Sequence, residues 1–260
     1  MVRIITCNTN GIRSAARKGF FDWLSGQDAD VVCIQETKAQ AHQLTDPTFT
    51  PAGYHCYYND AERKGYSGTA LFSRVKPRRV ITKLGWDPLD SEGRYIQADY
   101  AGLSIISLYM PSGSSSDAAL QKKLRFMDTF MEHMRALRRK RRQFIVCADW
   151  NICHKNADLR NWRSNQKNSG FLPEERAWLD VLYDEVGYVD AFRVINQEEE
   201  QYTWWSNRGQ AWAKNVGWRL DYQVITPRLV DAVREAEIYK AKRFSDHAPQ
   251  IMEYDLALTD

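Results

Sequence analysis

Residues 30–38 read Asp-Val-Val-Cys-Ile-Gln-Glu-Thr-Lys. The apolar run Val31–Ile34 is followed at once by the polar residues Gln35–Lys38. This pattern predicts a short buried strand that ends by presenting an acidic side chain, Glu36. In layered α/β folds, functional side chains gather in the segments that follow such strands. The segment therefore indicates an α/β architecture with a candidate site at a strand end.

The rest of the chain fits the same architecture. Helical periodicity covers roughly 13–25, 117–141 and a segment that begins at Pro173. No long linker rich in Gly, Ser and Pro divides the chain, because the nearest candidate, 111–117, is short and ends in a plausible helix cap. We expect one α/β domain over residues 1–260. Further strand-like runs, rich in Ile, Val, Leu and Tyr, occur at 2–7, 67–73, 94–99, 103–109, 143–147, 219–225 and 248–254.

The composition excludes some classes of protein. The hydrophobic fraction of 43% and charged fraction of 27% are those of an ordinary globular protein, and no apolar run of about 20 residues predicts a membrane span. The first residues lack the features of a signal peptide, so we expect a cytoplasmic location. A net charge of +3 gives only weak support for a polyanionic partner. The five cysteines are scattered, and Cys7, Cys33 and Cys147, which lie in or beside β-branched runs, are interpreted as small buried residues in a reducing compartment.

Polar side chains follow or adjoin six of the apolar runs. Each residue alone is compatible with a purely structural role, such as a charged residue in a loop, a turn residue or a histidine whose hydrogen bonds are all made within the fold. Taken together, they bring carboxylates, amides, a phenol and an imidazole to the ends of separate segments. This combination favours a functional site. The residues are Asn8, Asn10, Glu36, Tyr109, Asp149, Asn151, Asp221, Asp246 and His247.

These residue types suit metal-assisted phosphoryl chemistry. A phosphodiester needs its oxygens neutralised, a positioned water and help for the leaving alkoxide. Mg²⁺ takes one or two carboxylates and keeps several waters, so few acidic ligands suffice. A carboxylate beside an imidazole fixes its tautomer and raises its pKa, which makes it cationic next to phosphate. The motifs HExxH and GxSxG, paired CxxC motifs and a Walker A loop are all absent from the sequence.

The order of motifs along the chain resembles the exonuclease III family of abasic-site endonucleases, within the DNase I-like superfamily. The resemblance runs nearly end to end and implies a four-layer α/β sandwich, in which two mixed sheets pack face to face with helices on both outer sides. The motifs that carry it are CNTNGIRS, VCIQETKA, GYSGTALFSR, EGRYI, LYMPSG, CADWNICH, KNSGFLPEERAWLD, QYTWWSNRGQAWAKNVGWRLDY and RFSDHAP.

The resemblance also implies roles for the polar residues, with Mg²⁺ as the cofactor and Mn²⁺ as a substitute. Glu36 corresponds to the principal metal carboxylate, and the positions around the metal are Asn8, Asn10 and Asp246. The catalytic positions are Tyr109 and His247 for the phosphate, Asp149 and Asn151 for the attacking water, and Asp221 as the partner of His247. Lys38 resembles a lysine near the metal carboxylate, and its role stays open.

The aromatic segment supplies the substrate that the resemblance implies. Trp204, Trp218 and Leu220 match a small apolar pocket that holds a flipped deoxyribose without its base. A compact abasic sugar would enter such a pocket, whereas an intact base would not fit. Asn165, Asn168 and Arg208 are placed for contacts with the DNA backbone. The implied reaction is hydrolysis of the phosphodiester 5′ to an abasic site in duplex DNA by a monomer, with 3′→5′ exonuclease or 3′-phosphodiesterase activity alongside.

Three positions depart from the family pattern. Ala148 stands where the family usually has Gly, so a methyl group could crowd the turn before Asp149. Cys153 replaces a small Ala, and Asn10 occupies a position where some relatives have Asp. The alternatives are a regulator that binds nucleic acid without turnover, and hydrolysis of inositol phosphates or sphingomyelin. The complete acidic set argues against the first, and the segment around Trp204 and Trp218 argues against the second.

Overall fold

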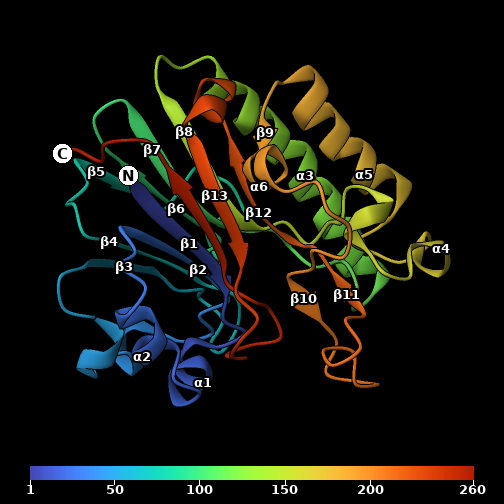
Figure 1. Cartoon of the computed structure of the whole chain (residues 1–260), viewed down its shortest axis with the longest axis horizontal. Coiled ribbons are helices and arrows are strands. Elements are labelled where there is room, and N and C mark those ends of the chain that lie inside the picture. The colour runs from blue at the N-terminus through green and yellow to red at the C-terminus, as the bar shows by residue number, and fades with distance from the viewer.

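The computed structural model describes all residues from 1 to 260 and shows two mixed six-stranded sheets packed face to face (Figure 1). The first sheet has the order β13-β14-β1-β2-β4-β3 and the second has the order β5-β6-β7-β8-β12-β9. The first sheet comprises β1 (Val2–Asn8), β2 (Val31–Gln35), β3 (His55–Asn59), β4 (Thr69–Ser73), β13 (Val233–Ile238) and β14 (Gln250–Tyr254). The second comprises β5 (Arg79–Ile81), β6 (Tyr95–Asp99), β7 (Leu103–Tyr109), β8 (Gln143–Asp149), β9 (Val189–Asp190) and β12 (Asp221–Ile225).

Helices cover the outer face of each sheet, which confirms the four-layer sandwich (Figure 1). α1 (Ile12–Arg17) and α2 (Phe20–Ser25) pack on the first sheet. α3 (Asp117–Arg138) and α5 (Pro173–Asp180) pack on the second. The remaining elements are α4 (Trp162–Asn165), α6 (Ala191–Ile195), a π-helical turn at Val181–Glu185, and 3₁₀ turns at Ala41–Gln43, Pro47–Phe49, Asn156–Asp158 and Pro227–Ala232.

The predicted first helix is wrong in one respect. Instead of one helix over 13–25, two short helices meet at Gly19, whose φ of 83° belongs to the left-handed region that ends helices. Phe20, Phe21 and Leu24 are buried on one side, as the periodicity predicts. α3 agrees better with its prediction, because the Ser116 hydroxyl accepts a hydrogen bond from the Ala119 N–H and caps its first turn.

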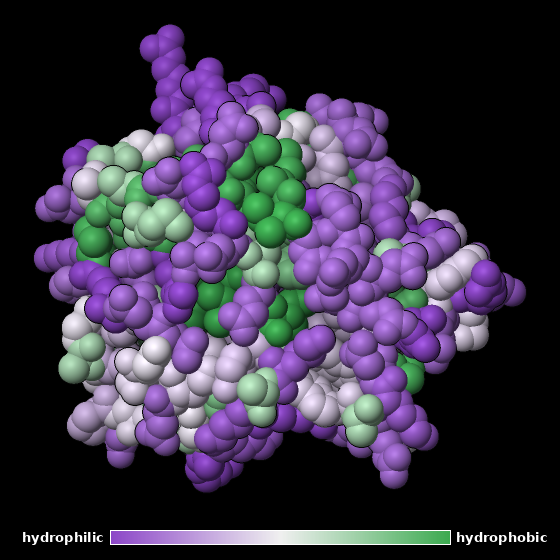
Figure 2. All heavy atoms as spheres, in the orientation of Figure 1, coloured by the Kyte–Doolittle hydropathy of each residue, from purple (hydrophilic) through white to green (hydrophobic).

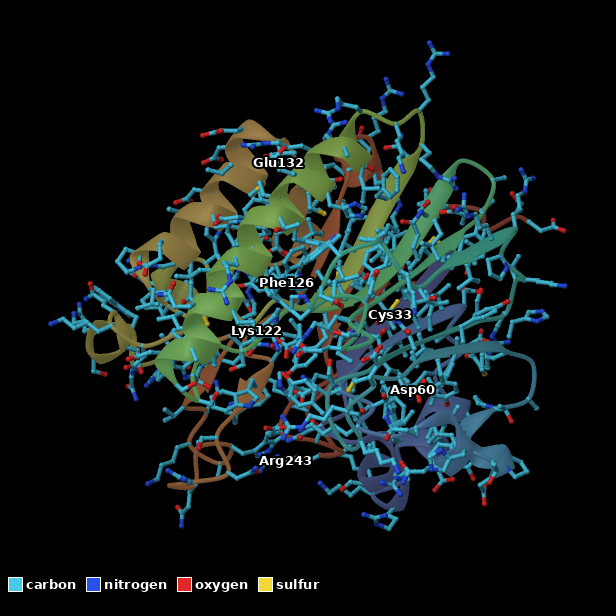
Figure 3. The ribbon with its side chains drawn as sticks, turned by 180° about the vertical axis from the view of Figure 1, so that it is seen from behind. Cys33, Asp60, Lys122, Phe126, Glu132 and Arg243 are labelled. Atoms are coloured by element: carbon cyan, nitrogen blue, oxygen red, sulfur yellow. The ribbon has the colours of Figure 1, made fainter.

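The core between the sheets is formed by side chains from the facing strands, including Ile4, Cys33, Ile145 and Cys147. Figure 3 shows Cys33 among the strands, and its burial confirms its interpretation as a small core residue. Among large hydrophobic residues only Met1 and Ile195 are exposed, and Figure 2 shows a surface on which hydrophilic residues predominate. No helix has both the length and the apolar character that a membrane crossing requires.

Strand direction places the polar residues together. β1 and β2 run parallel, with Asn8 opposite Gln35, so both strands end at the same edge. β7 and β8 also run parallel and bring Tyr109 opposite Asp149, while antiparallel β12 begins there with Asp221 opposite Asp149. The edge where these strands of both sheets meet therefore holds the side chains that the sequence predicts to form a site.

Candidate active site

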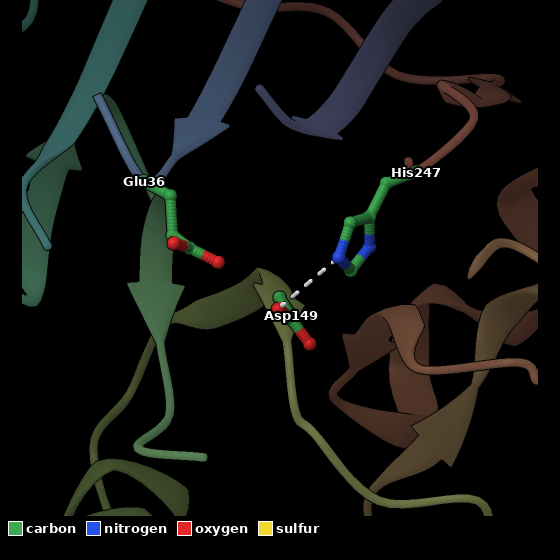
Figure 4. A group of neighbouring side chains, drawn as sticks. All are labelled: Glu36, Asp149 and His247. Carbon is green, nitrogen blue, oxygen red and sulfur yellow. Dashed lines mark ion pairs between the residues drawn. The ribbon is translucent and has the colours of Figure 1, made fainter. Parts of the chain in front are cut away.

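A cavity of about 720 Å³ opens where the two sheets end. Figure 4 shows Glu36, Asp149 and His247 pointing into a common space from separate segments. Their ligand atoms all lie within 4.8 Å of one another. The cavity is lined by Asn10, Glu36, Lys38, Tyr109, Ser112, Gly113, Ser114, Ser115, Ser116, Asp117, Leu120, Asp149, Asn151, Lys167, Asn168, Ser169, Gly170, Trp204, Trp218, Leu220, Asp246 and His247.

The Asn8 side chain joins two of the acidic groups. Its amide Nδ2 donates to Glu36 Oε1 and to Asp149 Oδ2, at 2.8 Å in each case. Glu36 Oε2 lies 2.7 Å from the ammonium of Lys38. Asn8 is fully buried, so its amide holds the two carboxylates at a fixed separation. The resulting group of hard oxygen donors suits a divalent cation such as Mg²⁺.

His247 stands between two carboxylates. Its Nδ1 lies 2.8 Å from Asp221 Oδ2, and its Nε2 lies 3.9 Å from Asp149 Oδ2. Burial alone would lower the pKa of His247, but Asp221 and Asp149 outweigh it and raise that pKa to about 10. The imidazole is therefore cationic near neutral pH. Asp221 fixes the orientation of the ring, as its expected partner role requires.

Asp149 is almost completely buried, with 1% of its surface exposed. Burial raises its pKa to about 7, with Asp221 and Glu36 adding to the effect and His247 opposing it. The Asn151 N–H donates to Asp149 Oδ1 at 2.9 Å, and the Asn151 amide donates to the Met110 carbonyl. An acidic group with a raised pKa beside other carboxylates is a setting that a bound cation would stabilise.

Tyr109 ends β7 beside these acids. Burial, followed by the charge of Glu36, raises the pKa of Tyr109 well above its ordinary value, so the phenol keeps its proton. The guanidinium of Arg94 lies 4.6 Å from the Tyr109 ring centroid and donates to the Tyr109 carbonyl at 3.0 Å. Tyr109 thus offers the cavity a fixed hydrogen-bond donor.

Asp246 connects the acidic group to the aromatic wall. Its Oδ1 accepts from the Asn10 amide at 2.9 Å and its Oδ2 accepts from Trp204 Nε1 at 3.0 Å. Burial would raise the pKa of Asp246, but His247 and these two hydrogen bonds lower it. Asp246 therefore stays ionised and belongs to the same polar cluster as Asn10, as the sequence predicts.

Four residues of the site have positive φ although none is glycine. These angles are 44° at Asn10, 51° at Glu36, 48° at Lys38 and 52° at Asn151. Such backbone is uncommon for residues with side chains and persists only where the surroundings enforce it. At Glu36 it turns the chain at the end of β2, where the Glu36 carbonyl accepts from the Gly11 N–H at 2.8 Å. The strand ends are thus bent so that their side chains converge.

The predicted apolar residues form one wall of the cavity. β10 (Trp204–Trp205) pairs with β11 (Gly217–Trp218) and places Trp204 opposite Trp218, with their rings edge to face at a centroid distance of 6.2 Å. Leu220 packs in the same small apolar cluster. Trp204 also forms an isolated bridge with His247, which ties this wall to the polar side of the site.

The three residues predicted to contact DNA are placed differently. Asn168 lines the cavity, and its amide donates to Asn165 Oδ1 at 2.7 Å. Asn165 stands behind Asn168 and does not line the cavity. Arg208 is exposed on the loop after β10 and also lies outside it. The structure therefore brings only Asn168 to the cavity itself.

One part of the cavity wall does not appear among the sequence predictions. The loop Ser112–Ser116, together with Asp117 at the start of α3, forms a rim of small polar side chains. In the sequence this stretch is considered only as a short candidate linker. Its run of serines before a helix cap is the signal that could have identified it as part of a binding site. Lys167, Ser169 and Gly170 also line the cavity, and Ser169 lies beside Gly113 of this loop.

The departures at Ala148 and Cys153 have clear structural outcomes. Ala148 lies within β8, its φ is not positive, and its methyl group is fully buried in the core under α3 and α5. It therefore points away from the cavity and does not crowd the segment before Asp149. Cys153 is buried against Leu159 and Leu220, where its larger side chain fills the apolar cluster.

Residues 5–247 match the model of the endonuclease/exonuclease/phosphatase family. The chain belongs to this family. It is 35% identical to an exodeoxyribonuclease of Bacillus subtilis (strain 168), over 95% of this chain and 97% of that protein. It is 34% identical to the DNA repair nuclease APEX1 of Danio rerio, over 95% of this chain and 80% of that protein.

Solved structures show the same fold. An AP endonuclease from Archaeoglobus fulgidus superimposes with a TM-score of 0.90 at 27% identity, over 98% of this chain and 100% of that one. A 3′-5′ exonuclease from Neisseria meningitidis superimposes with a TM-score of 0.89 at 26% identity. The predicted four-layer sandwich is therefore confirmed by the family as well as by the strand order. As a member of this family, the chain is a metal-dependent nuclease.

Proposed function

We propose that this nuclease hydrolyses the phosphodiester 5′ to abasic sites in duplex DNA, with Mg²⁺ as its metal ion. The observation that carries the proposal is the meeting of the Glu36–Asp149–His247 group with an apolar wall of Trp204, Trp218 and Leu220. The first part suits phosphodiester hydrolysis. The second suits a sugar that has no base. The names of the relatives, a DNA repair nuclease and an AP endonuclease, support the same reaction.

Each side chain has a role that follows from its surroundings. Asp149, held by Asn8 and by the Asn151 N–H, accepts a proton from the attacking water and orients it. The cationic His247 and the phenol of Tyr109 donate to the non-bridging phosphate oxygens. Asp221 keeps His247 oriented and charged.

A divalent ion would be held by Glu36, with Asn8, Asn10 and Asp246 around it. When bound, Mg²⁺ supplies positive charge that stabilises the phosphate oxygens. The acidic group fits such an ion because its oxygens converge within a few ångströms and burial already strains the ionisation of Asp149. Mn²⁺, which also prefers oxygen ligands, is proposed to substitute.

The apolar wall and the rim would select the substrate. Trp204, Trp218 and Leu220 receive the flipped deoxyribose, and Asn168, supported by Asn165, contacts the neighbouring backbone. Arg208 reaches DNA from the loop outside the cavity. All the groups of the site come from one chain, which supports a monomer as the acting form. The names of two relatives, an exodeoxyribonuclease and a 3′-5′ exonuclease, support an accompanying 3′→5′ exonuclease activity.

The test uses duplex DNA that carries one stable abasic analogue, incubated with Mg²⁺, Mn²⁺ or EDTA. We expect a single nick 5′ to the analogue with either metal and none with EDTA. Asp149→Asn and His247→Ala lower turnover by at least roughly 10²-fold with the fold retained. Asp22→Asn and His42→Ala, which change exposed residues of the same types, are matched controls. Salt-sensitive DNA binding without a metal-dependent nick would refute the proposal.

A further inference from the structure

A fully buried ion pair lies directly behind the site. Lys123 of α3 and Glu175 of α5 are both 0% exposed, and the Lys123 ammonium donates to Glu175 Oε1 at 2.5 Å. Figure 3 shows the course of α3 past Lys122, the neighbour of Lys123, and on through Phe126 and Glu132. Burying two charges costs desolvation energy that their attraction often fails to recover. The attraction between the two charges therefore adds little to the stability of the fold. The role of the pair depends on the other groups to which each charge is hydrogen-bonded.

The Lys123 ammonium holds the segment that carries Asn151. It donates to the Asn151 carbonyl at 2.7 Å, and Asn151 is one of the residues with positive φ. The Asn151 N–H in turn donates to Asp149 Oδ1. Lys123 is thus connected to the proposed catalytic carboxylate through the backbone of one residue, Asn151, and two hydrogen bonds. The bond from Lys123 thus adds a long-range constraint to a segment that otherwise bonds locally to Asp149.

The Glu175 carboxylate holds the neighbouring part of the cavity rim, Ser169–Leu172. Its Oε2 accepts from the Gly170 N–H at 2.6 Å and from the Leu172 N–H at 2.9 Å, and its Oε1 accepts from the Ser169 hydroxyl at 3.0 Å. Ser169 and Gly170 line the cavity next to Asn168. The Gly170 carbonyl accepts from the Cys153 N–H at 2.7 Å, so the rim and the segment after Asn151 are already adjacent.

We propose that Lys123 and Glu175 are positioning residues, whose ion pair locks the Asn151 segment and the Ser169–Leu172 rim into one rigid unit. The pair lies outside the cavity and touches no substrate. It acts by fixing Asp149 and its water on one side and the rim beside Trp218 on the other. This inference rests on the proposed function, since it assigns the pair to the geometry of that reaction. A displacement of a catalytic group by about 1 Å lowers the reaction rate by up to about 10²-fold, even when the mutation that causes it lies far from the reacting atoms.

The test compares Lys123→Met with Leu137→Ala. Leu137 is buried on the same helix but far along it from the site, so its truncation lowers stability without touching either segment. Both variants are assayed at a temperature where circular dichroism shows them folded. We expect kcat for abasic-site incision to fall roughly 10- to 100-fold in Lys123→Met and to change less than twofold in Leu137→Ala. Equal kcat values in the two variants would overturn the proposal.

Two further measurements separate positioning from stability. In the double variant Lys123→Met/Glu175→Gln, no buried charge is left unpaired, and the amide oxygen at position 175 can still accept from the N–H groups of Gly170 and Leu172. We expect its Tm to recover while kcat stays low; recovery of both together would show a purely structural pair. Hydrogen exchange in Lys123→Met should rise in both 149–154 and 168–173, and a rise in neither or only one would also overturn it. Because exchange needs no turnover, it decides this inference even if the wild-type protein leaves abasic DNA uncut, which would refute the proposed function alone.

Discussion

Gly170 offers a direct test of how the apolar wall is held in place. Its φ is +97°, and a Cβ added there would lie 3.1 Å from Trp218 Cζ3 and 3.4 Å from the Asn151 carbonyl oxygen. Gly102 is the matched control, because its φ of +70° is also left-handed but a Cβ there meets nothing within 4 Å. Both variants therefore place an alanine at a positive φ, and only Gly170→Ala also brings its Cβ against Trp218 and the Asn151 carbonyl.

The magnitudes follow from these two geometries. An alanine in left-handed backbone costs about 1–2 kcal/mol. For a chain of 260 residues, an unfolding entropy of about 2.1 cal/mol/K per residue converts 1 kcal/mol into roughly 2 °C of Tm. Gly102→Ala should lose about 2–4 °C and leave incision unchanged. Gly170→Ala should lose roughly twice as much Tm, because its φ is less favourable and Trp218 must move by a few tenths of an ångström.

The decisive assay is incision of a duplex with one abasic analogue, measured as kcat/KM for both variants with saturating Mg²⁺. We expect a loss of about tenfold in Gly170→Ala, which corresponds to about 1.4 kcal/mol of transition-state stabilisation. If Gly170→Ala incises as well as Gly102→Ala while losing Tm as expected, Trp218 has room to shift. The reasoning that Gly170 fixes the position of Trp218 in the sugar-binding wall would then be wrong.

Two further predictions concern stability. Burial lowers the pKa of His133 to about 4, so between about pH 6.5 and pH 4 the unfolded chain takes up a proton that the folded chain does not. Stability should therefore fall on acidification by up to about 3 kcal/mol more in the wild type than in His133→Phe, as measured by urea unfolding at pH 7 and pH 4.5. Ala148→Gly should lower the free energy of unfolding by about 1–2 kcal/mol, since it removes a buried methyl group and loosens β8, while incision stays within twofold. Loss of incision in folded Ala148→Gly would show that the methyl group shapes the site.

The strands that sequence patterns predict are the eight interior strands of the two sheets. Interior strands such as β2 and β4 are buried at every position, so most of their residues are apolar and the strands appear as apolar runs. The edge strands β3, β5, β9 and β13 were not predicted. β13 alternates exposed charges with few buried residues, and β3 has only partly exposed or exposed positions. An edge strand pairs with a neighbouring strand along only one edge, and its other edge faces solvent. Its residues therefore need not form an apolar run, and sequence patterns do not reveal it.

The residues of the site also fall into a group that sequence patterns predict and a group that they do not. Its polar residues are predictable because they directly follow interior strands, and parallel pairing brings those strand ends together at one edge. The Ser112–Ser116 rim, by contrast, follows no pattern of strand or helix, and its position depends on where α3 begins. Asn168 and Arg208 lie in loops, Asn165 ends the four-residue helix α4, and only the folded chain shows that Asn168 alone reaches the cavity. Loop shape is set by tertiary contacts, which residue identity does not encode locally.

The bent strand ends explain why these residues need support from elsewhere. Positive φ opposes local preference at Glu36 and Lys38, and the local bonds from the Asn10 N–H to Asn8 and from the Asn151 N–H to Asp149 hold only part of the arrangement. The structure supplies the missing constraint through distant groups, such as the Gly11 N–H on the Glu36 carbonyl and the Lys123 ammonium on the Asn151 carbonyl. The sequence therefore predicts which groups the site contains, while the convergence of those groups depends on buried partners far along the chain. Chemistry and positioning are thus carried by different residues, which is why a change at Lys123 and a change at Asp149 should both lower kcat.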